Sequence, residues 1–224
     1  MEKIRIKQSL RERLPSFNFF WAELKGVRIF PSSKEFVKVL EEERKKLLAN
    51  LSLKDLTKEE NINQTRKAFK SLGIDPARYR PSQEALIRRI LLNRNISLVN
   101  NAVDLMNFLS IRYRLAMGIY DQEKIRGKLL IREGRDEEHF LGINMRVINS
   151  QKKIVLADSE GVIGSPYIDS QRTKVSEESR NLIHIIYLVP SKFEEEDFIE
   201  AKELIFNFLG AQILGYCKVK EVEQ

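Results

Sequence analysis

The sequence predicts one α+β domain, and three observations lead to this prediction. Apolar residues recur at helical spacing in four segments before residue 114 and in one segment near the end. Shorter apolar runs after residue 114 are bounded by turn-forming residues, as strands are. No internal repeat or low-complexity linker divides the 224 residues, so we expect a single domain over 1–224.

The first 74 residues are predicted to form an N-terminal strand and helical layer. An amphipathic stretch at 4–14 precedes a strand at 17–30, which is rich in aromatic and branched residues. In the helix that follows at 31–51, Ser32 and Glu35 have capping-box spacing. A shorter helix ends at Gly73, and the turn-rich stretch "IDPARYRPS" then joins this layer to the rest of the chain.

Two helices and a series of strands are predicted next. Pro81 and Ser82 mark the start of a helix that runs to residue 93, with Ser82 as the expected N-cap. The second helix covers 100–113, and strands are expected at 115–121, 127–134, 153–158 and 181–189. Ser191 and Glu194 form a second capping box before a helix at 196–210, and a strand at 213–222 ends the chain.

The helix at 100–113 carries a polar stripe on an otherwise apolar surface. Asn100, Asp104 and Asn107 fall on one narrow line at about 3.6 residues per turn. Structurally, Asn100 would cap the helix and Asp104 would hold a neighbouring backbone group. Functionally, amide and carboxylate groups at a pocket wall would bind the ammonium and carbonyl groups of an amino acid. Periodicity alone favours the structural interpretation.

Arginines gather around the preceding helix. Arg78, Arg80, Arg88 and Arg89 could bind phosphates, because guanidinium groups match phosphate oxygens. Equally, one or two of them could neutralise Asp104 inside the fold, or a second carboxylate, Asp121.

Positive charge is concentrated in the first 135 residues. They contain 29 lysines and arginines against 16 aspartates and glutamates, whereas residues 136–224 contain 10 against 16. Such a distribution could attract a polyanion such as RNA, or could be a solvated basic surface.

Several classes of protein are disfavoured by the sequence. The apolar runs are far shorter than the roughly 20 residues of a membrane span, so we expect a cytoplasmic protein. Cys217 is the only cysteine, and His139 and His184 are the only histidines, which argues against a metal site. The common nucleotide-binding and nucleophile motifs are absent, and we expect no cofactor.

Two longer segments carry a family resemblance. The stretches "RYRPSQEALIRRIL" and "NNAVDLMNFLSIRYRLAMGIYDQEKIRGKLLIREG" resemble the tRNA-editing domain of the phenylalanyl-tRNA synthetase beta subunit. They are most similar to free-standing proteins built from that domain. The resemblance covers about 75–210, and it implies a mixed, largely antiparallel central sheet flanked by helices, with the pocket between sheet and helices.

The resemblance also implies a function. In the synthetase this module hydrolyses tyrosine wrongly attached to phenylalanine tRNA. We therefore expect a trans-acting editing protein whose partners are tRNA and an aminoacyl ester or amino acid. The alternative is a non-catalytic RNA-binding or amino-acid-binding module that has lost the editing activity. The oligomeric state is left open.

The candidate site residues follow from the matched positions. Hydrolysis needs an oriented water and a stabilised oxyanion, and no metal. The expected residues are Asp104, Asn100 and Asp121 for catalysis, Arg80, Asn107, Gly118, Tyr120 and Arg132 for substrate binding, and Arg88 and Arg89 for RNA binding.

The chain departs from the synthetase pattern at three places. Gly118 stands where the synthetase motif has a histidine, and Ile185 stands where a pocket glutamate would fall. The stretch "SPYIDSQRT" replaces a glycine-rich pocket loop. These departures favour the non-catalytic alternative, and they leave the substrate open.

Overall fold

The computed structural model describes residues 4–190, 195–213 and 215–224, and it has the predicted α+β fold. The helices are α1 (Gln8–Arg13), α2 (Lys34–Asn50), α3 (Glu60–Ser71), α4 (Ser82–Leu91), α5 (Asn101–Tyr113) and α6 (Glu195–Leu209). The short 3-10 helices are η1 (Leu56–Lys58) and η2 (Gln122–Lys124).

The strands form two larger sheets and one hairpin. The upper sheet has the order β10 (Gln212–Ile213), β2 (Phe17–Lys25), β9 (Asn181–Pro190) and β3 (Ala116–Asp121), with β11 (Cys217–Lys218) also paired to β2. The lower sheet has the order β12 (Val222–Glu223), β1 (Arg5–Lys7), β4 (Leu130–Glu133), β7 (Ile154–Asp158) and β8 (Gly161–Gly164). The hairpin pairs β5 (His139–Leu141) with β6 (Val147–Asn149).

Most strand pairs are antiparallel. Only β1 runs parallel to its neighbours, β4 and β12, among the strand pairs of the described residues. The sheets are therefore mixed and largely antiparallel, as the resemblance implied.

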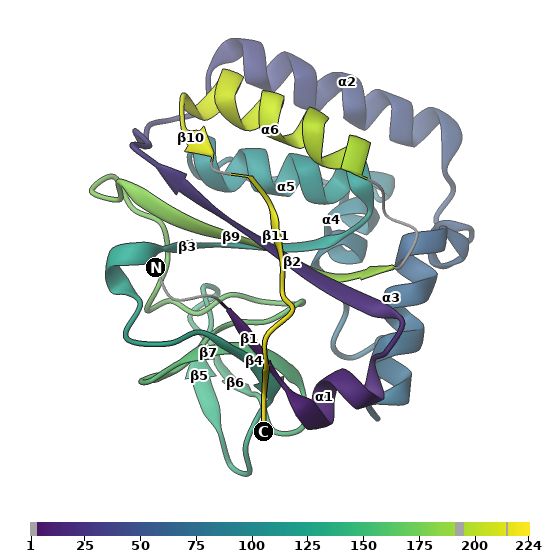
Figure 1. The fold of residues 1–224 in the computed structure, drawn as a ribbon. Helices are drawn as coiled ribbons and strands as arrows, with labels where there is room; N and C mark the ends of the chain where they lie inside the picture. Colours follow the sequence, from purple (N-terminus) through teal and green to yellow (C-terminus); the bar gives the residue numbers. More distant parts are fainter. Residues whose placement is uncertain (1–3, 191–194, 214) are drawn as a thin grey trace.

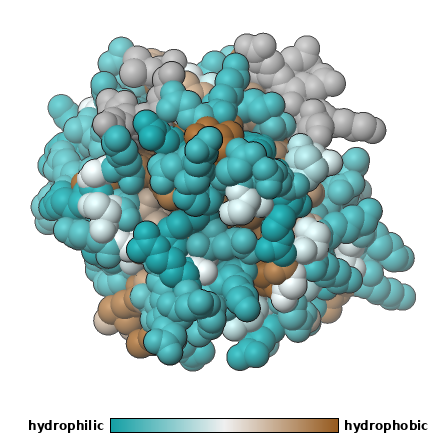
Figure 2. Space-filling model, turned by 60° about the horizontal axis from the view of Figure 1, so that its bottom comes forward, coloured by the Kyte–Doolittle hydropathy of each residue, from teal (hydrophilic) through white to brown (hydrophobic). Residues whose placement is uncertain are grey.

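The layers are stacked in the order helices, upper sheet, lower sheet. Figure 1 shows α2, α5 and α6 covering one face of the upper sheet, with the lower sheet on its other side. One apolar core fills the space between the helices and the upper sheet and includes Phe108, Ile186 and Ile205. A second core lies between the two sheets and includes Tyr120, Ile131 and Ile185. Figure 2 shows that the underside of the molecule is mostly hydrophilic, with hydrophobic residues in small separate patches.

The structure corrects two predicted helix starts. The N-cap of α2 is Ser33, whose side chain accepts a hydrogen bond from the Phe36 amide, and Ser32 is used elsewhere. The N-cap of α4 is Pro81, so that Ser82 is the first helical residue, and its amide donates to the Pro166 carbonyl at 2.9 Å. In both cases the predicted cap located the start of the helix to within one residue.

Two further expectations differ from the structure. The strand predicted at 17–30 ends at Lys25, because Gly26 turns the chain with a φ of +70°. The final stretch forms three short strands that pair with two different sheets, instead of one strand at 213–222. The capping box at Ser191 and Glu194 lies outside the described residues. The division of the chain at residue 75 stays a prediction.

Candidate functional site between the two sheets

The polar stripe of α5 fastens the start of this helix to the segment before α2. Asn100 is the N-cap, and its Oδ1 accepts from the Val103 amide at 2.9 Å. Asp104 accepts from the Val99 amide at 2.8 Å through Oδ1 and from the Ser32 hydroxyl at 2.6 Å through Oδ2. Both carboxylate oxygens of Asp104 are therefore engaged in holding the fold.

Asn101 completes this junction, although the sequence did not single it out. Its amide nitrogen donates to the Arg28 carbonyl at 2.9 Å, and its Oδ1 accepts from the Phe30 amide at 3.2 Å. Burial raises the pKa of Asp104, against the hydrogen bonds that favour its charged form. Asn107 is half-buried further along the helix. Asn100 and Asp104 thus have the structural role that periodicity favoured for the stripe.

Asp121 lies at the end of β3 and is also held by its neighbours. Its Oδ1 accepts from the Glu123 amide at 3.1 Å, and its Oδ2 accepts from the Ser179 hydroxyl at 2.6 Å. Lys124 Nζ lies 3.1 Å from Oδ2 and balances the charge. These contacts start η2 and attach it to the chain before β9. The catalytic role of Asn100, Asp104 and Asp121 remains a prediction.

Two of the candidate arginines, Arg80 and Arg132, form ion pairs with glutamates, and within the described residues neither pairs with Asp104 or Asp121. Arg80 Nε lies 3.4 Å from Glu84 Oε1, and Arg66 also contacts this buried carboxylate at 2.9 Å. Arg132 is 7% exposed and makes two hydrogen bonds to Glu138, at 2.6 and 2.8 Å. Such a bidentate pair holds a guanidinium group in one orientation and leaves it little freedom to bind substrate.

Arg88 and Arg89 lie in the last turn of α4. Arg89 is exposed, and its Nε donates to the Asn95 carbonyl at 2.6 Å, whereas Arg88 is half-buried. Arg89 therefore reaches the surface fully and Arg88 in part. Their RNA-binding role remains a prediction.

Gly118 and Tyr120 meet residues of β9 between the two sheets. The β3–β9 register pairs Gly118 with Ile185, so the two departures from the synthetase pattern are cross-strand neighbours. Tyr120 is fully buried, and its hydroxyl lies 2.7 Å from Asp169 Oδ1 and 2.7 Å from the Tyr187 hydroxyl. We call Tyr120, Asp169 and Tyr187 the tyrosine–aspartate cluster.

Two glycines make room for this cluster. A Cβ on Gly118 would lie 2.2 Å from the Tyr120 hydroxyl oxygen, and one on Gly164 would lie 2.1 Å from the same atom. The Gly164 position would also bring a Cβ within 2.6 Å of Asp169 Oδ1. The Tyr120 side chain therefore occupies the space that a histidine at position 118 would enter.

Asp169 is the group of the cluster whose pKa lies near neutral pH. Its carboxyl is held among protein atoms, and burial raises its pKa from 3.8 to about 7, although the hydrogen bond from Tyr120 opposes the shift. Burial also raises the pKa of Tyr120 and Tyr187 well above the usual value, so both remain neutral donors. Asp169 is only half-buried as a residue, and no described residue donates a hydrogen bond to its Oδ2.

The family follows from a sequence comparison. Residues 64–193, which are 130 of the 224 residues, match the sequence model of the B3/4 domain. The chain belongs to the B3/4 domain family. The tyrosine–aspartate cluster lies within the matched residues, as do β3 and β9 of the upper sheet, whereas β2, β10 and β11 lie outside them.

Two relatives of this B3/4 chain are beta subunits of the same enzyme. The phenylalanine–tRNA ligase beta subunit of Bartonella quintana is 33% identical over 87 residues, which are 38% of this chain and 11% of the relative. The beta subunit of Fusobacterium nucleatum is 24% identical over 100 residues, 43% of this chain and 12% of the relative. The chain thus matches about a tenth of the length of these relatives, and it is similar to one part of that subunit.

One solved structure aligns with almost the whole chain. It is an N-terminal fragment of the phenylalanyl-tRNA synthetase beta subunit from Pyrococcus horikoshii. The alignment covers 98% of this chain and 54% of that one, with a TM-score of 0.47 and 13% identity.

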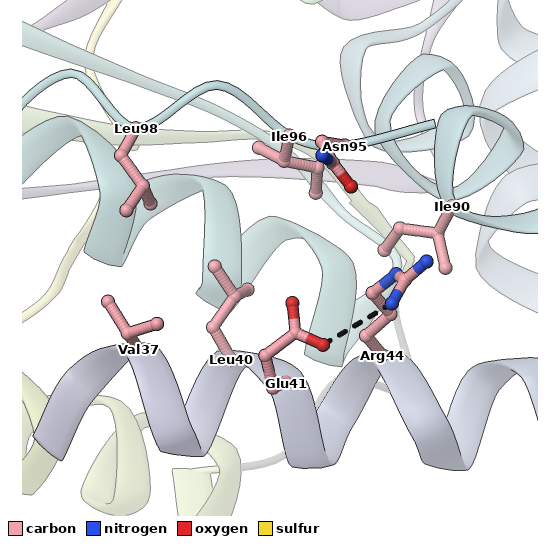
Figure 3. Close-up of a pocket in the computed structure, with 8 residues that line it drawn as sticks. All are labelled: Val37, Leu40, Glu41, Arg44, Ile90, Asn95, Ile96 and Leu98. Carbon is pink, nitrogen blue, oxygen red and sulfur yellow. Dashed lines mark hydrogen bonds and ion pairs between the residues drawn. The ribbon is translucent and has the colours of Figure 1, made fainter. Parts of the chain in front are cut away.

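The clearest cavities of this B3/4 chain lie away from the predicted catalytic residues. Four have volumes of about 210, 460, 310 and 420 Å³, and none of them is lined by Asp104, Asp121 or Asp169. Figure 3 shows the first, between α2 and the 95–98 segment, where the Glu41–Arg44 ion pair lies beside aliphatic side chains. Within the described residues, no group of three potential metal ligands occurs and no helix is long and apolar enough to cross a membrane.

Sequence reasoning missed Asp169, Tyr187 and Gly164. The stretch "SPYIDSQRT" was noted as a replacement for a pocket loop, but nothing local marks its aspartate as the partner of Tyr120. His184 was also noted, yet it is a core residue: it is fully buried, Nδ1 lies 3.0 Å from the Tyr216 hydroxyl, and burial lowers its pKa to about 3. It is therefore neutral and has no place in proton transfer at neutral pH.

Proposed function

We propose that this B3/4 chain hydrolyses the ester of a mischarged tRNA in trans, as a free-standing editing protein. The family membership and the similarity to a part of the phenylalanine–tRNA ligase beta subunit support a function connected with tRNA. The basic excess of the first 135 residues supports a polyanionic substrate. The observation that carries the proposal is Asp169, whose Oδ1 accepts from Tyr120, whose Oδ2 has no hydrogen-bond partner among the described residues, and whose pKa burial raises to about 7.

The chemistry assigned to Asp169 is general base catalysis. Its Oδ2 accepts a proton from a water molecule as the water oxygen bonds to the ester carbonyl carbon. The bond from that carbon to the ribose oxygen then breaks, and the proton passes to the departing ribose. A base with a pKa close to the working pH suits both proton transfers. Tyr120 donates to Oδ1 at 2.7 Å and fixes the orientation of the carboxyl.

Arg80 is the candidate for binding the substrate oxyanion. Its Nε is buried without a hydrogen-bond partner, although it lies within ion-pair distance of Glu84. It lies two residues before the start of α4, and the first amide of that helix contacts the Pro166 carbonyl in the same loop as Asp169. A guanidinium group placed there would stabilise negative charge that develops on the carbonyl oxygen.

The test is a multiple-turnover deacylation assay over a panel of mischarged tRNAs. We expect Asp169→Asn to lose most of the activity, and Asp136→Asn, which changes an exposed aspartate, to retain it. We also expect no effect of EDTA. Asp121→Asn in the same assay tests the sequence-based assignment. If Asp121→Asn abolishes turnover and Asp169→Asn does not, the base has been placed in the wrong part of the site.

A non-catalytic tRNA-binding module is the second candidate. It is favoured by the Tyr120 side chain, which fills the space beside Gly118, and by Ile185 at the position of the pocket glutamate. Tight tRNA binding without turnover on any aminoacyl-tRNA would establish this alternative and exclude editing.

A further inference from the structure

A basic groove lies between the segment after α3 and the connection from β6 to β7. It has a volume of about 420 Å³, and its lining includes Asp75, Arg78, Tyr79, Lys152 and Lys153. Three cations therefore face one carboxylate, and Asp75 Oδ1 already accepts from the Ala77 amide at 2.9 Å. The groove carries a net positive charge that the described residues do not neutralise.

Lys153 is the most informative residue of the groove. It is 8% exposed, and Nζ lies 4.3 Å from the centroid of the Tyr79 ring. Its ammonium group has two polar contacts, to Asn149 Oδ1 and the Gln151 carbonyl, both at the long distance of 3.3 Å. No carboxylate of the described residues lies within ion-pair distance of it. A cation removed from water without a counter-charge is costly, so an anionic ligand would relieve this cost.

Arg78 and Lys152 extend the charge toward the solvent. Both are exposed, and the Arg78 guanidinium carbon lies 5.3 Å from the Tyr79 ring centroid. The two side chains and Lys153 thus provide donors at different depths of one groove. Guanidinium and ammonium groups both bind phosphate oxygens through charge-assisted hydrogen bonds.

The groove adjoins the loop that carries Asp169. The Tyr79 ring packs edge to face against Tyr167, with centroids 5.7 Å apart. Tyr167 is two residues before Asp169, and the Pro166 carbonyl contacts the start of α4, three residues after Tyr79. A chain of phosphates bound in the groove would therefore pass beside the proposed catalytic loop.

We propose that this groove binds backbone phosphates of the RNA whose aminoacylated end is presented to Asp169. The inference rests on the proposed function for the identity of the RNA, and it names Arg78, Lys152 and Lys153 as the residues that contact phosphate.

The experiment measures binding of uncharged tRNA as a function of KCl concentration. The test variant is the full chain with Arg78→Gln and Lys153→Met, and the matched control carries Lys38→Gln and Lys45→Gln on the exposed face of α2. Each lost phosphate contact lowers the magnitude of the slope of log K against log salt by about 0.7 to 0.9. We expect the test variant to lose roughly 1.5 from this slope, and the control variant to keep it.

Rescue and competition distinguish this proposal from a packing defect and from a site for free phosphate. Lys153→Arg should keep the slope if charge is what matters, and a melting curve of each variant checks that it is folded. Inorganic phosphate should compete with tRNA no better than KCl does at equal ionic strength. Equal slopes for the test and control variants would overturn the proposal for this groove. Inorganic phosphate that binds the protein without weakening tRNA binding would also overturn it.

The outcome is separable from that of the proposed function. Uncharged tRNA has no ester, so a loss of slope with no deacylation anywhere would support the groove and refute editing. Deacylation that persists, with equal slopes for the test and control variants, would support editing and refute the groove.

Discussion

Replacement of Asp169 by asparagine should change how stability depends on pH. The pKa of this carboxyl is raised from 3.8 to about 7 in the folded protein, so folding favours its protonated form. Below pH 4 the group is protonated in both states and has no effect on stability. Between pH 4 and 7 the unfolded chain is ionised while the folded protein holds its proton, so the free energy of unfolding falls as the pH rises.

The size of the effect follows from the shift. Each pKa unit corresponds to about 1.4 kcal/mol, so three units correspond to about 4 kcal/mol of lost stability above pH 7. Asparagine keeps an acceptor for the Tyr120 hydroxyl, which lies 2.7 Å from Asp169 Oδ1, but it cannot ionise. We therefore expect Asp169→Asn to be more stable than the native protein at pH 8, by an amount of order 2 to 4 kcal/mol, and equally stable at pH 4.

Urea unfolding at one-unit pH intervals from 4 to 9 measures this difference. Glu137→Gln, which removes an exposed carboxylate, is the control and should leave the pH profile of the native protein unchanged. A constant difference between Asp169→Asn and the native protein over this range would refute the reasoning, because it would mean that Asp169 ionises equally in both states.

Two further substitutions test the packing of the site. Gly118→Ala should destabilise the protein by about 1 to 3 kcal/mol, because its Cβ would lie 2.2 Å from the Tyr120 hydroxyl oxygen. Tyr120→Phe in the same chain should restore part of this stability, as measured by urea titration. No loss of stability in Gly118→Ala would mean that the Tyr120 ring moves aside freely. Asp104→Ala should cost about 2 to 3 kcal/mol, because the Val99 amide and the Ser32 hydroxyl lose their acceptor. Lost deacylation by Asp104→Ala at unchanged stability would instead favour its assignment as a catalytic residue.

The sequence by itself located the main helices and indicated the family. Apolar spacing located α2, α4 and α5, and the cap at Asn100 marked the start of α5, since these signals depend on residues within one or two turns. The ordered motif from residue 100 to 134 was enough to identify a domain similar to a part of the phenylalanyl-tRNA synthetase beta subunit.

Only the tertiary structure decided which polar groups meet. Asp104 is bound by Ser32, 72 residues away, and Asp169 is bound by Tyr120, 49 residues away. Neither pairing leaves a local pattern, because a hydrogen bond between distant segments depends on strand register and on how the layers stack. For the same reason the sequence left open whether the α5 stripe has a structural or a catalytic role, and it did not mark Asp169, whose pKa is raised only once two sheets enclose it.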